Sequence, residues 1–290
     1  MRIVYRTEEN VVRAYEGKER IGQVTVPDID FQWADGVHVL MAGISGVGTQ
    51  EAYRRRGIAA AMMEEAVAFS TREGYASSGI TTAHGSVARR LYSRAGYTTL
   101  FCPGCYRKRL GTGAMPDVSG ISIRRFVDGD AESLVSLFEE TYSPFFGLRR
   151  KTASGWQRYR QEILEQNPDR IAVAEGRDGI LGWSGNFDQW VGLVSEVWVK
   201  PCANREEIAQ ALLSHLEGRM IADGLDEAHL WASPDDVFTA GLAGRNGYAF
   251  SEQRVFMLRI LDLPVLLREL LPLYNRRATD PLPWQGSLEL

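Results

Sequence analysis

The sequence has no long apolar run and no recognisable export signal. No stretch approaches the roughly 18 consecutive apolar residues that a membrane-spanning helix needs. The N-terminus, MRIVYRTEEN, lacks the apolar core of a secretory signal peptide. We therefore expect a cytoplasmic protein that has no membrane partner.

Cysteine is scarce, with three residues in the chain: Cys102, Cys105 and Cys202. Three cysteines cannot form a disulfide framework. The first two form a lone C-x-x-C in the segment CPGC, but the sequence offers neither a second C-x-x-C nor a closely spaced His pair to complete a zinc site. We therefore expect no metal. The Pro-Gly pair predicts a hairpin turn, and a redox pair is the alternative.

An excess of positive charge is absent as well. The 33 Lys and Arg residues are outnumbered by 37 Asp and Glu residues, the two signs are interleaved, and the net charge is −4. Domains that bind nucleic acid usually carry a basic patch, so no nucleic-acid partner is expected, although residues 54–56 are three consecutive arginines. At about 100–200 residues per domain, a chain of 290 residues with 44% hydrophobic residues suggests two domains with apolar cores.

What the chain does contain is an internal repeat. Residues 47–74 align without a gap with residues 197–224, and LYSRAGY at 91–97 matches LAGRNGY at 242–248. Each copy predicts a strand, a loop, a helix of about four turns, a second strand and a short helix. The apolar face of the long helix recurs, at Ile58, Met62, Ala66 and Phe69 in the first copy and at Ile208, Leu212 and Leu216 in the second.

The repeat and the composition around it divide the chain. We expect an N-terminal domain over 1–110, a linker rich in Gly and Pro over 111–120, a C-terminal domain over 121–262, and a helix with an irregular tail over 263–290. The fold class is α/β with mixed sheets, in the α+β sense. Each of the two tandem domains is expected to be a twisted mixed β-sheet with flanking helices.

The two copies differ at their front. The second copy predicts two leading helices, at 130–142, where Asp130 is the expected N-cap, and at 151–164. The first copy has no room for them, because its strand-like segments begin at the N-terminus. The N-terminal domain is therefore expected to lack these two helices, either as a minimal version of the domain or because its true start lies upstream.

The segment YRRRGIAA at 53–60 is the candidate phosphate-binding loop of the first copy. A strand that runs through a glycine-containing loop into a helix leaves backbone N–H groups unpaired at the positive end of the helix dipole, where phosphate oxygens bind. Gly57 allows close approach because it has no Cβ. The segment matches neither the Walker loop nor the dinucleotide fingerprint. A solvated, charged turn stays open as the alternative.

The pattern R-x-x-G-x-A, carried by Arg54, Gly57 and Ala59, and the downstream segment ARRLYSRAGY at 88–97 resemble two motifs of the GCN5-related N-acetyltransferase (GNAT) superfamily. The chain looks most like tandem GNAT proteins of the enhanced-intracellular-survival type. This resemblance implies an acetyl-CoA-dependent N-acetyltransferase, with acetyl-CoA as co-substrate and a small-molecule amine, or a protein or peptide amine, as acceptor. A non-catalytic acyl-CoA-binding or regulatory protein is the alternative, and a homodimer stays open.

The resemblance also implies roles for residues of the first copy. The strand that holds Val47 is expected to splay from its neighbour and to pair with the pantetheine amides. Tyr92 is expected to be the general acid that protonates the CoA thiolate, and packing beneath the cofactor without proton transfer is the alternative. The predicted cofactor-binding residues are Val47, Gly48, Thr49, Arg54, Arg55, Arg56, Gly57, Ile58 and Ala59.

The base that deprotonates the amine is not evident from the sequence. His84 precedes the short helix and is of a type that titrates near neutral pH, whereas Glu51 lies in the cofactor loop and is expected to be solvated. Asp28, Asp30 and Asp35 precede the cofactor strand. Attraction of a cationic amine and simple solvation explain them equally well.

The second copy lacks the features that acetyl-CoA needs. Glu207 stands where the first copy has Gly57, and Ala243 stands where it has Tyr92. A carboxylate at the first position opposes a pyrophosphate both by its charge and by its bulk. We therefore expect the second copy to be a degenerate domain that serves as a scaffold or lines part of the substrate groove.

Overall fold

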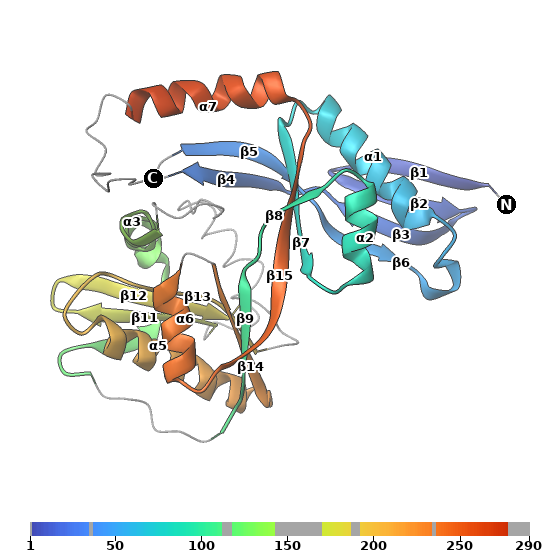
Figure 1. The fold of residues 1–290 in the computed structure, drawn as a ribbon. Coiled ribbons are helices and arrows are strands. Elements are labelled where there is room, and N and C mark those ends of the chain that lie inside the picture. The colour runs from blue at the N-terminus through green and yellow to red at the C-terminus, as the bar shows by residue number, and fades with distance from the viewer. Residues whose placement is uncertain are drawn as a thin grey trace, which may run out of the picture. The chain divides into compact units, whose positions relative to one another are not determined.

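The structure is a computed structural model that describes residues 2–34, 37–111, 118–142, 170–186, 192–233 and 236–277. These residues form two units (Figure 1). Among them, unit 1 takes those up to Leu100 and those from Phe256 onward, and unit 2 takes those from Phe101 to Val255. The helix predicted over 151–164, Asp35, most of the linker and the tail beyond 277 lie outside the described residues.

The first sheet of unit 1 is antiparallel and has the strand order β1 (Ile3–Glu8), β2 (Val11–Glu16), β3 (Glu19–Thr25), β6 (Ser45–Thr49). The described residues up to 49 form strands joined by short turns and links, and no helix occurs among them. Helix α1 (Ile58–Arg72) packs on this sheet. The side chains of Ile58, Met62 and Ala66 are buried at the spacing that the repeat predicts.

The second sheet of unit 1 contains β4 (Asp28–Ala34), β5 (Val37–Gly43), β7 (Ser77–Ala83) and the part of β15 (Ala249–Ile260) from Phe256 on, with β8 (Thr98–Phe101) paired to β15. Helix α2 (Val87–Arg94) contacts β7, and helix α7 (Leu263–Arg277) contacts β5 (Figure 1). The buried side chains of Leu266 and Leu270 fix α7 against Val37, Val39 and Ala76. Unit 1 therefore includes a strand end and a helix from the C-terminal part of the chain.

The sheet of unit 2 has the strand order β10 (Ser122–Arg125), β11 (Ile171–Gly176), β12 (Gly179–Asn186), β13 (Gly192–Val199), β14 (Glu227–Ala232), β9 (Gly104–Arg109) and the first part of β15. Successive side chains of a strand point to opposite faces of the sheet, so β13 contacts a helix on each face. Val197 and Val199 join the core of α5 (Arg205–Ala222), whereas Trp198 packs against Phe138 of α3 (Ala131–Tyr142) in a tilted arrangement, with ring centroids 4.7 Å apart. Helix α6 (Val237–Arg245) contacts β14.

Strands β9 and β15 are exchanged between the two sequence copies. Strand β9 follows the first copy in sequence, yet it lies in unit 2 between β14 and the first part of β15. Strand β15 ends the second copy, yet its part from Phe256 on lies in unit 1 beside β7. The expected boundaries at 110 and 262 do not coincide with these units, because each sheet is completed by a strand from the other copy.

The segment CPGC differs from its predicted hairpin. It links β8 to β9, and these two strands both pair with β15 rather than with each other. The Pro-Gly pair therefore continues the chain along one neighbouring strand instead of reversing it. Cys102 is partly exposed, Cys105 is buried, and both are free thiols.

The expected N-cap of α3 also differs. Asp130 directly precedes α3, but its carboxylate accepts a hydrogen bond from the N–H of Val127 at 2.9 Å and pairs with Arg124 at 2.7 Å. The guanidinium of Arg124 holds the carboxylate on the side of the preceding turn. The other elements predicted within the described ranges are present, including the long helices α1 and α5, the short helices α2 and α6, and the hairpin β11–β12.

None of the helices within the described ranges combines the length and the apolar character needed to cross a membrane.

Candidate functional site

Two parallel strands of unit 1 separate at the start of the predicted cofactor segment. Strands β5 and β7 pair at Ala42–Ser78 and at Gly43–Gly79, and the N–H of Ile44 donates to the carbonyl oxygen of Gly79 at 2.8 Å. The chain then continues as β6, which pairs with β3. In the described part of the chain, no strand pairs with the other edge of β6. The backbone groups on that edge are available to an extended ligand with amide groups.

The predicted residues Val47, Gly48 and Thr49 lie on this edge strand. Gly48 and Thr49 are in register with Gln23 and Gly22 of β3. The Thr49 hydroxyl oxygen is buried and has no hydrogen-bond partner within the described residues. An orphaned polar atom of this kind is costly unless a bound molecule or water satisfies it, which fits a ligand site along β6.

Gly57 has the backbone conformation and the surroundings that a phosphate site requires. Its φ is +78°, in the left-handed region that favours glycine. A Cβ built on Gly57 would have no atom within 4 Å. Packing inside the protein therefore does not require this glycine, and the space beside its backbone is open to a ligand.

The amides that follow Gly57 form the N-terminus of α1. The first intrahelical hydrogen bond runs from the N–H of Ala61 to the carbonyl oxygen of Gly57 at 3.1 Å, so the N–H groups of Ile58, Ala59 and Ala60 have no intrahelical acceptor. Gly57 supplies no side-chain cap. The Ile58 side chain is buried, with 2% exposure, and anchors this turn in the core. The result is a fixed set of unpaired donors at the positive end of a 15-residue helix.

The three arginines of the loop differ in their contacts. Arg54 donates from Nε to the carbonyl oxygen of Thr49 at 3.4 Å. Arg56 pairs with Glu16 at 3.1 Å and lies over the ring of Tyr53 at 5.1 Å. Arg55 has a φ of +63° and is exposed, and no hydrogen bond or ion pair of its side chain is described. Arg55 is therefore the member of the trio whose charge is available to an anion.

The β2–β3 hairpin holds this loop in place, which the sequence analysis missed. Glu16 binds Arg56, and Glu19 accepts a hydrogen bond from the hydroxyl of Tyr53 at 3.2 Å. Gln50 donates to the carbonyl oxygen of Arg20 at 2.6 Å. The hydrogen bond from Arg56 lowers the pKa of the Glu16 carboxyl below its usual range. No local pattern links positions 40 residues apart, so the sequence contains no direct signal for these contacts.

Tyr92 lies on α2, which contacts the fork strand β7. Its side chain is buried, with 6% exposure, and burial raises the pKa of its hydroxyl above the usual value of 10.0. The hydroxyl is therefore protonated at neutral pH. No hydrogen bond from this hydroxyl to another described residue is present. Tyr92 thus offers a proton donor that no described residue of the protein occupies.

The base candidates are placed less favourably. His84 is exposed, and its Nε2 lies 3.1 Å from Nη1 of Arg89, which is a permanent cation and a donor. Nε2 therefore accepts a hydrogen bond from Arg89, so this ring nitrogen is already occupied by a donor. The Glu51 side chain is 91% exposed, as expected for a solvated loop residue.

The two described acidic residues before the cofactor strand have protein partners. Asp28 accepts a hydrogen bond from the hydroxyl of Tyr75, and burial together with this carboxylate raises the pKa of Tyr75 to about 12. Asp30 lies 3.9 Å from Nδ1 of His38. These contacts give both carboxylates a structural role. No group of three or more metal-ligating side chains occurs within the described ranges.

The corresponding loop of the second copy has a different shape. Helix α5 begins at Arg205, so Glu207 lies within its first turn, not in a loop of positive φ. Arg205 donates to the carbonyl oxygen of Val199 at 3.0 Å, and its guanidinium lies 3.8 Å from the ring centroid of Phe238. Ala243 is fully buried in the core. A helical turn with an acidic side chain has replaced the glycine loop.

Comparisons with known proteins agree with this geometry. A sequence model described as an acetyltransferase (GNAT) domain matches residues 3–100. An acetyltransferase of Pectobacterium atrosepticum is 29% identical over 129 residues, which cover 42% of this chain and 83% of that protein. The matched family segment ends where unit 1 passes into unit 2.

Solved structures show the same fold over both units. Eis1 of Mycobacterium abscessus has a TM-score of 0.54 at 19% identity, covering 91% of this chain and 67% of that one. A tandem GNAT protein from the clavulanic acid biosynthesis pathway has a TM-score of 0.61 at 13% identity, covering 87% of this chain and 82% of that one. Residues 3–100 are therefore similar to an acetyltransferase (GNAT) domain, and the chain has the fold of tandem GNAT proteins.

Proposed function

We propose that unit 1 is an N-acetyltransferase that transfers an acetyl group from acetyl-CoA to an amine, and that unit 2 does not bind acetyl-CoA. The observation that carries the proposal is the open N-terminus of α1 behind Gly57, in a segment that matches the GNAT acetyltransferase family. Acetyl-CoA would enter as a co-substrate. The acceptor would be a small-molecule amine or an amine of a protein or peptide.

The residues of unit 1 fit this co-substrate at three places. The free edge of β6, with Val47, Gly48 and Thr49, would bind the amide groups of the pantetheine arm. The N–H groups of Gly57, Ile58, Ala59 and Ala60 would bind the pyrophosphate. The arginines at 54–56 would form the rim, with the Arg55 side chain contributing the charge that no described protein partner takes.

Tyr92 would complete the site as a general acid. Acetyl-CoA supplies the acetyl group as a thioester, and the CoA thiolate that leaves when an amine attacks requires a proton. The buried hydroxyl of Tyr92 keeps its proton at neutral pH, because desolvation disfavours the phenolate. It also has no competing acceptor among the described residues. This step needs a protonated donor, and Tyr92 would supply it from the helix that contacts the fork strand β7.

The proposal is tested by measuring CoA release from acetyl-CoA with a panel of amines, together with acetyl-CoA binding by calorimetry. Binding and amine-dependent turnover are expected. Binding without turnover across the panel would instead indicate a non-catalytic acyl-CoA-binding protein. The absence of both would contradict the proposed function.

A further inference from the structure

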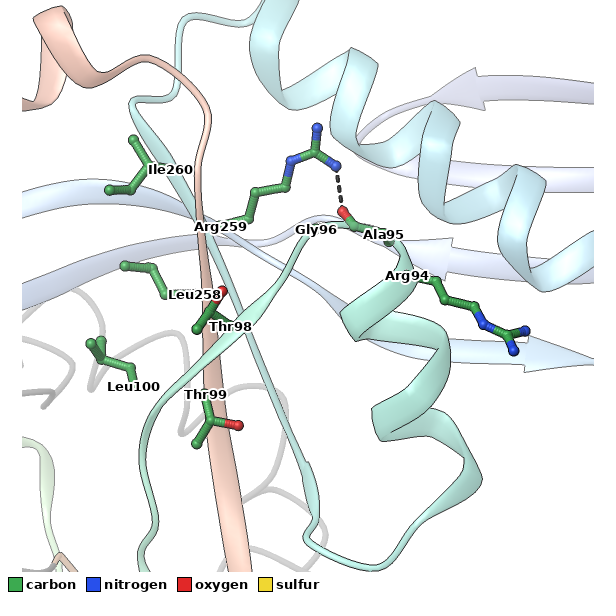
Figure 2. Close-up of a pocket in the computed structure, with 9 residues that line it drawn as sticks. All are labelled: Arg94, Ala95, Gly96, Thr98, Thr99, Leu100, Leu258, Arg259 and Ile260. Atoms are coloured by element: carbon green, nitrogen blue, oxygen red, sulfur yellow. Dashed lines mark hydrogen bonds between the residues drawn. The ribbon is translucent and has the colours of Figure 1, made fainter.

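Arg259 reaches α2 from a strand that belongs to the other sequence copy. It lies on the part of β15 that is in unit 1. Its Nη1 donates a hydrogen bond to the carbonyl oxygen of Ala95, the C-cap residue of α2 (Figure 2). Cationic side chains at a helix C-terminus satisfy its last carbonyl groups and interact favourably with the dipole.

The Arg259 guanidinium also fits against the turn that follows α2. Gly96 has a φ of +84°, and a Cβ built on it would lie 3.2 Å from Nη1 and 3.4 Å from Nε of Arg259. A Cβ at these distances would crowd the guanidinium, and the positive φ also favours glycine, so Gly96 allows the close approach. Arg259 therefore contacts the corner at which α2 ends and the chain turns into β8.

This corner is connected directly to Tyr92. The N–H of Tyr97 donates to the carbonyl oxygen of Tyr92 at 3.0 Å, and the hydroxyls of Tyr97 and Ser78 are 2.7 Å apart. Burial raises the pKa of Tyr97, and the positive charge of Arg259 opposes this shift. Arg259, Tyr97 and Tyr92 thus form one contiguous group between β15, the corner and α2.

The repeat contains a counterpart of this arrangement in unit 2. At the offset of 151 that relates LYSRAGY to LAGRNGY, Lys108 corresponds to Arg259 and Tyr248 corresponds to Tyr97. Lys108 lies 5.4 Å from the ring centroid of Tyr248 and pairs at 2.7 Å with Glu217, which also accepts from the Tyr248 hydroxyl at 2.8 Å. The exchanged strands therefore each carry a cation to the Gly-Tyr corner of the other copy.

We infer that Arg259 is a positioning residue for acetyl transfer: it fixes the α2–β8 corner and through it the orientation of Tyr92. This inference rests on the proposed function of unit 1. Unit 2 has a cation at the aligned position but no tyrosine to position, because Ala243 replaces Tyr92. The second copy thus contributes to the catalytic unit through the strand it donates, although its own cofactor loop is lost.

The test measures kcat and KM of Arg259→Ala, Arg259→Lys and the control Arg94→Ala. Arg94 and Arg259 both line a surface hollow of about 590 Å³ beside the α2–β8 corner. The Arg94 side chain is exposed and points away from Arg259 (Figure 2). We expect Arg259→Ala to lower kcat about tenfold or more, since small misplacements of a catalytic group have large effects. KM for acetyl-CoA should change little, Arg259→Lys should restore most of kcat, and Arg94→Ala should match the wild type.

A double-mutant cycle separates positioning from a general loss of structure. If Arg259 acts through Tyr92, Arg259→Ala should change kcat by less than about threefold in a Tyr92→Phe background. A full, additive loss in that background, or an unchanged kcat in Arg259→Ala alone, would overturn the inference. Thermal melting of each variant identifies any that fail to fold. If Arg259→Ala does not fold, Arg259→Lys replaces it in the comparison with the wild type. Absence of wild-type turnover would contradict the proposed function instead.

Discussion

Replacing Gly57 with alanine should impair acetyl-CoA binding far more than it impairs folding. Because Gly57 has a φ of +78° and a built Cβ meets nothing within 4 Å, the only cost to folding is that of an L-residue in the left-handed region, about 1 kcal/mol. In a unit of this size that lowers Tm by about 2–4 °C. The new methyl group, however, occupies the space beside the helix amides.

The effect on binding can be estimated from the amides that the methyl group blocks. A phosphate oxygen binds an amide nitrogen at about 2.9 Å, so it cannot share the space with the methyl group. Loss of one charge-assisted hydrogen bond costs about 1.5–3 kcal/mol. This corresponds to a rise of roughly 10- to 150-fold in Kd for acetyl-CoA. Glutamate at Gly57, the residue type of the second copy, adds like-charge repulsion and should abolish measurable binding.

Gly74 provides a matched control at the other end of α1. Its φ is +82°, and a Cβ built on it also meets nothing within 4 Å. Gly74→Ala should therefore lower Tm as much as Gly57→Ala does, while leaving Kd at the wild-type value. Calorimetry with acetyl-CoA and thermal melting measure the two quantities. Equal and undiminished binding by both variants would refute the assignment of the pyrophosphate to the α1 N-terminus.

Three further predictions concern the rest of unit 1. Tyr92→Phe should lower kcat about 100-fold with KM for acetyl-CoA nearly unchanged, and a Phe variant with full kcat would exclude the general-acid role. Because burial raises the pKa of Tyr92 above 10.0, the wild type should lose no activity from Tyr92 ionisation until the pH exceeds that value. Glu16→Gln breaks the ion pair with Arg56 and should raise Kd for acetyl-CoA about two- to fivefold. The control Glu8→Gln breaks an exposed pair with Arg13 on the same sheet and should leave Kd unchanged. Equal effects of the two substitutions would argue against a role of Glu16 in positioning the loop. A chain that ends at residue 255 lacks the β15 end and α7, so unit 1 should lose cooperative melting and acetyl-CoA binding, and retention of binding would show that the exchanged strand is dispensable.

Local patterns were sufficient to predict the elements of the two copies. The spacing of Ile58, Met62 and Ala66 predicts the buried face of α1 because helical periodicity is a short-range property. The glycine at 57 and the helix after it predict unpaired amides for the same reason. The sequence comparison between the copies also indicates where the second copy departs, since Glu207 and Ala243 occupy aligned positions.

Long-range pairing was not predictable in the same way. The strand exchange depends on which edges are free when both sheets form, and nothing in the sequence of β9 or of β15 states its neighbours. The contacts of Glu16 with Arg56 and of Arg259 with Ala95 join distant segments. Lys108 and Arg259 are basic residues at aligned positions. This match can be interpreted only once the structure shows that their strands are exchanged.

The most direct test of the two-unit assignment is the stoichiometry of acetyl-CoA binding, measured by titration calorimetry on the full chain. Unit 1 has the glycine loop and the open α1 N-terminus, whereas in unit 2 a helical turn with Glu207 occupies the equivalent place. We predict one acetyl-CoA per chain, with binding lost in Gly57→Glu. Two equivalents per chain, or one equivalent that persists in Gly57→Glu, would contradict this assignment.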